Sequence, residues 1–225
     1  MLERADRGIS ATTSGTNDPI RRSTEPAAGG LVLSSSRLET FSDGVFAIAI
    51  TLLVLDLTID AARGNHLLRA LLDLWPSYLA YLTSFSIVGL VWMGHHVILS
   101  LSMRVDRRLL KINLALLLVV AFLPFPTRLL TEFISDPRAE RVAAVFYGVW
   151  LLVISVALAG MWRYTSANNR LLRDDFSQAR IDHITRIFQP NIALYAVGIA
   201  LGLILPQIAA GLYLVIAVVG FIRTA

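Results

Sequence analysis

The stretch LWPSYLAYLTSFSIVGLVWMGHHVILSLSM, residues 74–103, decides the fold, because its 30 residues include no Asp, Glu, Lys or Arg. An α-helix rises about 1.5 Å per residue, so about 20 apolar residues cross the roughly 30 Å hydrocarbon core of a bilayer. A charge at the bilayer centre costs about 2.5–3.5 kcal/mol, so charge-free runs of this length are typical of membrane spans. The stretch is therefore predicted to cross a membrane.

The composition of the whole chain favours the same class of protein. Of its 225 residues, 56% are hydrophobic and 16% are charged, whereas soluble domains carry about 25% charged residues. Six spans of about 20 residues leave no room for a separate catalytic domain. The chain lacks HExxH and GxSxG motifs and contains no cysteine, so neither an enzyme nor a disulfide is expected.

Gaps between charged residues predict the remaining spans. We expect an all-α integral membrane protein with six transmembrane helices, at about 41–59, 74–101, 109–130, 142–162, 187–205 and 207–222. The last two belong to one uncharged run of 36 residues, which is too long for a single crossing. Pro206 marks the expected turn, because proline interrupts a helix.

The basic residues predict the orientation. With both termini in the cytoplasm, 15 of the 20 Lys and Arg residues lie on the inner side, as the positive-inside rule favours. Residues 1–36 are rich in Ser, Thr, Gly and Arg and are predicted to form a disordered cytoplasmic tail, whereas 37–225 form the six-helix domain. The positive-inside distribution thus gives a reason for the excess of basic residues behind the net charge of +4. Membrane lipid is therefore an expected partner, and nucleic acid is not.

The first span carries an acidic residue near each end, Asp43 and Asp56, which is typical of a helix shielded from lipid. Its bulky apolar residues form a seam with spacings of four and three: Phe41, Val45, Ile48, Leu52, Leu55 and Ile59. Beside it runs a stripe of small residues, Thr40, Gly44, Ala47 and Thr51. Two interpretations stay open: both stripes pack against helices, or the seam meets its copies around an axis as a hydrophobic constriction.

A second candidate feature is a set of polar residues near the inner ends of the first two spans. It comprises Ser42, Asp43, His95 and His96, with Trp92 and Arg37 beside them. Hydrogen bonds among them would satisfy groups that cannot stay unpaired in a bilayer. The set either holds the helices together or takes part in proton sensing or ion passage. His95 and His96 point about 100° apart on a helix, so they are not expected to share a metal ion.

Three motifs in order extend this picture: RLETFSD at 37–43, WMGHH at 92–96 and LPFPT at 123–127. The first matches in full the RxxxFSD signature of the transmembrane protein 175 family, the endosomal and lysosomal potassium channels and their prokaryotic relatives. The second resembles the tryptophan and paired histidines of that family's second helix, and the third the proline-containing end of its third helix. The resemblance covers roughly residues 37–221.

This resemblance implies a potassium-permeable cation channel of the prokaryotic plasma membrane, in which the first helices of a homotetramer line a central pore. The family's constriction corresponds to Ile48 here, with further apolar layers at Leu52 and Leu55, and Thr51 corresponds to a threonine implicated in ion preference. Potassium is then the permeant ion, and no cofactor or metal site is expected. The chain contains no TVGYG segment, so a ring of backbone carbonyls is not expected as its filter.

One alternative of another class stays open. Asp43, His95 and His96 could form the titrating relay of a proton-coupled cation transporter. Transporters commonly contain inverted repeats, and the sequence has no clear internal repeat.

Overall fold

The computed structural model describes residues 35–58, 66–133, 136–167, 171–172 and 178–224. Regular structure within these residues is helical, apart from one isolated bridge between Ser102 and Leu172. The prediction of an all-α protein is therefore confirmed for this part of the chain. The predicted tail lies outside the described residues up to position 34, and Ser35 and Ser36 already belong to the first helix.

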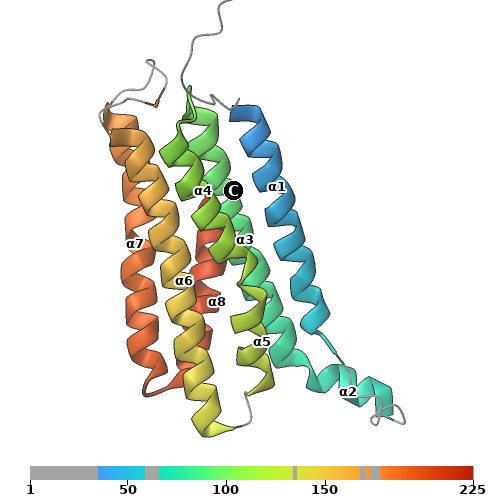
Figure 1. Ribbon diagram of the computed structural model, residues 1–225. Helices are drawn as coiled ribbons and strands as arrows, with labels where there is room; N and C mark the ends of the chain where they lie inside the picture. Colours follow the sequence, from blue (N-terminus) through green and yellow to red (C-terminus); the bar gives the residue numbers. More distant parts are fainter. Residues whose placement is uncertain (1–34, 59–65, 134–135, 168–170, 173–177, 225) are drawn as a thin grey trace, which may run out of the picture. The chain divides into compact units, whose positions relative to one another are not determined.

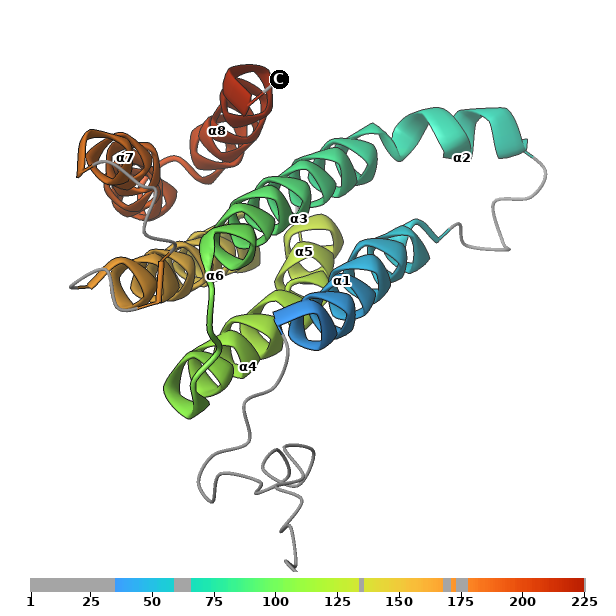
Figure 2. The same ribbon diagram turned by 90° about the horizontal axis from the view of Figure 1, so that it is seen from above.

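Figure 1 shows the helices in chain order. They are α1 (Ser35–Leu52), the 3₁₀ helix η2 (Leu53–Asp56), α2 (Leu67–Asp73), α3 (Trp75–Leu101), α4 (Arg107–Ala121), α5 (Pro124–Glu132), α6 (Pro137–Ser166), α7 (Gln178–Gly202) and α8 (Pro206–Thr224). Contacts join α6 to α7, α7 to α8, α3 to α8 and α4 to α6. Figure 2 shows α1 at the edge of this group, beside α3 and α4.

Four helical segments are long and apolar enough to cross a membrane: Ser36–Asp56, Trp75–Leu101, Arg107–Glu132 and Pro137–Ser166. Two shorter apolar helices follow, Ile192–Gly202 and Pro206–Ile222. The total of six spans therefore stays a prediction. The short helix α2 was not expected, because its seven residues, LLRALLD, are too few for a span or a clear period.

The segment predicted as one span over 109–130 is two helices, α4 and α5. Proline at 124 and 126 removes two backbone donors, and the Leu123 amide turns back to the Val120 carbonyl at 3.0 Å. This shorter turn leaves the Val119 carbonyl open, and the indole Nε1 of Trp150 donates to it at 2.8 Å. A side chain of α6 thus satisfies the backbone group that the break exposes.

The helices α6, α7 and α8 are held together by close packing around Tyr213. This tyrosine is fully buried, and its ring lies where side chains at Gly148 of α6 and Gly198 of α7 would otherwise stand. A Cβ atom at Gly148 would overlap the Tyr213 hydroxyl, whereas a Cβ at Gly160, on the same helix, would meet nothing within 4 Å. A larger residue therefore fits at position 160 of α6 but not at position 148.

We expect Gly148→Ala to lower the free energy of unfolding by about 1–3 kcal/mol, because the added methyl group overpacks a filled site. Gly160→Ala is the matched control and should be neutral or stabilising by up to about 1 kcal/mol, since alanine is the better helix former. Thermal unfolding in detergent measures both. Equal midpoints for the two variants would contradict the packing described for Tyr213.

Candidate functional site

The helix α1 has one buried face and one bare face. Leu38, Phe46, Ala49 and Leu53 are each at most 4% exposed and belong to the hydrophobic core, which α1 reaches through α3 and α4. Five other large apolar side chains of α1 and η2 stay uncovered: Phe41 (54%), Ile48 (61%), Leu52 (41%), Val54 (47%) and Leu55 (66%). Bare bulky residues on a helix of spanning length need a partner outside the described residues, either lipid or another chain.

The stripe of small residues lies in the middle of the bare face. Thr40, Gly44, Ala47 and Thr51 are all exposed, and a Cβ at Gly44 would meet nothing within 4 Å. At 100° per residue, the stripe lies about 170° from the buried face, and the bulky seam about 110° from it. Of the other seam residues, Val45 packs partly against the core and Ile59 lies outside the described residues.

The two threonines of the stripe direct their hydroxyl hydrogens back to their own helix. Thr40 donates to the Ser36 carbonyl at 3.0 Å, and Thr51 donates to the Ile48 carbonyl at 2.9 Å. This local bond satisfies the hydroxyl donor within the helix. What each threonine presents outward is therefore an oxygen with free lone pairs.

A chain of three buried polar residues, here called the buried triad, joins α1, α4 and α3. Ser42, Asn113 and His95 are each 0% exposed. Asn113 Nδ2 donates to Ser42 Oγ at 3.0 Å, and Asn113 Oδ1 lies 2.6 Å from His95 Nε2. Because the amide group already donates to serine, its oxygen accepts from histidine, which assigns the imidazole proton to Nε2.

The remaining bonds of the triad fix its surroundings. Ser42 Oγ donates to the Leu38 carbonyl at 2.8 Å, and the His95 ring lies 5.3 Å from the ring of Phe46, centroid to centroid. His95 Nδ1, the unprotonated ring nitrogen, is buried without a partner among the described residues. The triad therefore ties one face of α1 to two other helices.

Two polar pairs, here called the exposed pairs, lie nearer the surface of α1 and α3. Trp92 Nε1 donates to Asp43 Oδ1 at 2.8 Å, and His96 Nδ1 lies 2.9 Å from Glu39 Oε1. The rings of Trp92 and His96 are 6.0 Å apart, centroid to centroid. The side chain of His96 is 51% exposed, in contrast to the buried His95.

The structure brings most of the predicted polar set to α1 and α3 but divides it into these two groups. Adjacent histidines diverge on a helix, so His95 and His96 bond to different partners. Asp43 bonds to Trp92 rather than to a histidine. Arg37 is exposed, and no hydrogen bond or ion pair within the described residues joins it to either group.

Sequence reasoning missed two residues of these groups, Asn113 and Glu39. Asn113 is an amide within the apolar run of α4, and a polar side chain at membrane depth needs a partner. The sequence therefore contained a signal that could have identified Asn113. Glu39 stands at an unspecified position of RxxxFSD, so the motif could not mark it. No group of three or more His, Cys, Asp or Glu residues that could hold a metal occurs in the described part of the chain.

Comparison with known proteins identifies relatives of this arrangement. A family model described as the endosomal/lysosomal potassium channel TMEM175 matches residues 37–124, which include both groups. A potassium channel of Chamaesiphon minutus is 39% identical over 193 residues, or 84% of this chain and 95% of that protein. The human endosomal/lysosomal proton channel TMEM175 is 32% identical over 139 residues, or 58% of this chain and 28% of that protein.

A solved structure agrees with the sequence matches. The crystal structure of a lysosomal potassium-selective channel TMEM175 homologue from Chamaesiphon minutus aligns with a TM-score of 0.76 and 38% identity, covering 84% of this chain and 97% of that one. These relatives are ion channels and not enzymes. This agrees with the prediction, from the lack of HExxH and GxSxG motifs, that this chain is not an enzyme.

We expect Asn113→Leu to lower the free energy of unfolding by about 1–3 kcal/mol, because it leaves the His95 Nε2 donor unpaired in a buried site. The double variant Asn113→Leu with His95→Leu should recover part of this loss, since replacing both partners removes the unpaired group. Thermal unfolding of the single and double variants in detergent measures the coupling. Simple addition of the two single losses would contradict the bond between these residues.

Proposed function

This chain belongs to the family of the endosomal/lysosomal potassium channel TMEM175, and on that premise we propose that it is a potassium-permeable cation channel whose conduction path is lined by α1. The observation that carries the proposal is the bare face of α1 and η2, which combines exposed Ile48, Leu52 and Leu55 with a stripe of small residues. Its four apolar helices of spanning length support an integral membrane protein.

One α1 helix cannot enclose a path, so several copies have to meet around an axis. We propose four, the number that the family resemblance implies. The seam and the small stripe are about 80° apart around the helix at 100° per residue. The seam can then face the axis while the small stripe lies against the α1 of a neighbouring copy, where small residues permit close approach. This arrangement combines packing and constriction, the two interpretations that the sequence left open.

The proposed constriction is a ring of Ile48 side chains with Leu52 and Leu55 as further apolar layers. Such a ring offers no ligand to replace an ion's hydration shell, so conduction requires the ring to widen and wet. The absence of TVGYG from the sequence agrees with a path that selects ions without a carbonyl filter.

Thr51 fits a contribution to cation preference rather than to anion binding. Its hydroxyl hydrogen is held by the Ile48 carbonyl at 2.9 Å, which leaves an oxygen lone pair as the group it presents. An oxygen acceptor favours a cation near it. Its place on the small stripe puts Thr51 at the edge of the proposed path and not at its centre.

The proton-coupled transporter remains the second candidate, because ionisable residues lie beside α1. Within the described residues, however, Asp43, His95 and His96 bond to three different partners and form no continuous relay. The exposed pair of His96 and Glu39 contains the most exposed titratable side chain of this set, since the histidine side chain is 51% exposed.

We expect Ile48→Asn to raise potassium flux in proteoliposomes severalfold and to lower the preference for potassium over sodium, because an amide wets the ring. Val156→Asn is the matched control, since it makes the same change at an exposed position of α6 and should leave flux unaltered. Unchanged flux in the Ile48 variant, or an equal rise in both variants, would count against Ile48 as the constriction.

Single-channel recording separates the two candidate functions. We expect unitary currents that follow the electrochemical gradient of the permeant cations. A separate mass measurement of the detergent-solubilised complex should give the mass of four chains. Potassium movement against its own gradient, driven by a pH gradient, would instead establish the transporter.

A further inference from the structure

We propose that the basic end of α4 binds the phosphate headgroup of an anionic phospholipid, and that the same face of the helix holds one of its acyl chains. Four basic side chains lie within eight residues at this end: Arg104, Arg107, Arg108 and Lys111. All four are exposed. Neither the proposed conduction path nor the buried triad uses them, so this inference does not depend on the proposed function.

The spacing of residues along α4 places charge and apolar surface in line. Arg107, Lys111, Leu114 and Leu118 follow one another at intervals of four, three and four, which keeps them within about 60° around the helix. Leu114 is 46% exposed and Leu118 is 72% exposed. One face of α4 is thus cationic in its first turns and apolar beyond them, which is the order of groups in a phospholipid.

The depth of this face in a membrane matches a headgroup. The segment Arg107–Glu132 has 26 residues in two helices, so at 1.5 Å per residue it is at most about 39 Å long, against about 30 Å of hydrocarbon. Up to about one turn at each end therefore extends into the headgroup layer. Arg107 and Arg108 lie in that turn, and Lys111 can extend its charged group back to the same level.

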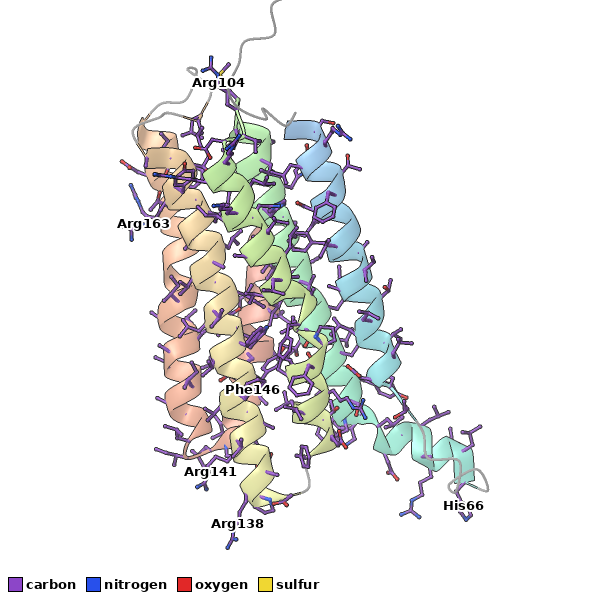
Figure 3. All side chains as sticks on the ribbon, in the orientation of Figure 1. His66, Arg104, Arg138, Arg141, Phe146 and Arg163 are labelled. Carbon is purple, nitrogen blue, oxygen red and sulfur yellow. The ribbon has the colours of Figure 1, made fainter. Side chains whose placement is uncertain are left out.

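The charges of this end are available to an anion. The neighbouring acid, Asp106, accepts from the Leu109 amide at 2.7 Å through Oδ1 and from the Tyr164 hydroxyl through Oδ2, so its carboxylate is directed to α4 and α6. The salt bridges of the described residues, His96 with Glu39 and Arg128 with Glu132, involve none of the four basic residues. Figure 3 shows Arg104 and Arg163 at this end, with Arg138 and Arg141 at the opposite end.

A lipid explains these observations better than a soluble phosphate compound or a second copy of the chain. A soluble compound would use the basic groups but not Leu114 and Leu118, which continue the same face at hydrocarbon depth. A second copy would have to bring acidic groups against four cations. Anionic lipid supplies both the charge and the chain, and its attraction corresponds to about fivefold in affinity for each Lys or Arg near the headgroups.

The test measures lipid binding to the full-length protein in detergent by native mass spectrometry. Phosphatidylglycerol and phosphatidylcholine with identical acyl chains are titrated separately, and we expect phosphatidylglycerol to bind more tightly. The double variant Arg107→Gln with Lys111→Gln should weaken phosphatidylglycerol about 25-fold, from fivefold per charge. The matched control, Arg138→Gln with Arg141→Gln, removes the same charge from the other end of the protein and should not alter binding.

A charge-preserving variant keeps the test decisive if the first variant folds poorly. Arg107→Lys with Lys111→Arg should retain the affinity for phosphatidylglycerol within about twofold. Equal affinity for the two lipids, equal weakening by both double Gln variants, or equally tight binding of glycerol phosphate would overturn the proposal. A change in the number of chains per complex without a loss of lipid affinity would assign this face to contact between copies and would also overturn it.

Discussion

The hydrogen-bonded chain from Ser42 through Asn113 to His95 is the interaction on which the placement of α1 depends. In a bilayer a polar side chain has no water to replace a missing partner, so these three residues are stable only when they meet. Each comes from a different helix, and their meeting therefore fixes the rotation and height of α1 against α3 and α4. Once that face is fixed inward, the seam with Ile48 and the stripe with Thr51 have to face away from the chain's own core.

The chain is held together by two different kinds of contact. Around Tyr213, glycines at 148 and 198 let α6, α7 and α8 approach so closely that an added methyl group would overlap the ring. The helix α1 has no such contact at Gly44 and is held by one apolar face, the triad and the two exposed pairs. The tightly packed helices therefore form a frame, and α1 is held against it on one side only.

Charge-free gaps were enough to predict helices of spanning length, because a charge in hydrocarbon costs so much free energy that it is rare there. Spacing was enough to place Ile48, Leu52 and Leu55 on one seam. The partners of the histidines were not predictable, because Asn113 lies 18 residues from His95 and 71 from Ser42, and only tertiary packing brings them together. The two prolines at 124 and 126 were a signal for the break, but the bond from Trp150 that supports it was not predictable, because Trp150 belongs to another helix.

Because of that break, α1 and η2 pack against two separate helices, α4 and α5, rather than against one. The first half of α1 is joined through Ser42 and Asn113 to α4, whereas η2, at the other end, packs against α3 and α5. The helices α4 and α5 meet at a break rather than in one continuous helix. The two ends of α1 therefore rest on different helices, and the hydrogen bonds of the buried triad hold the half that contains Ser42, whereas apolar packing holds η2.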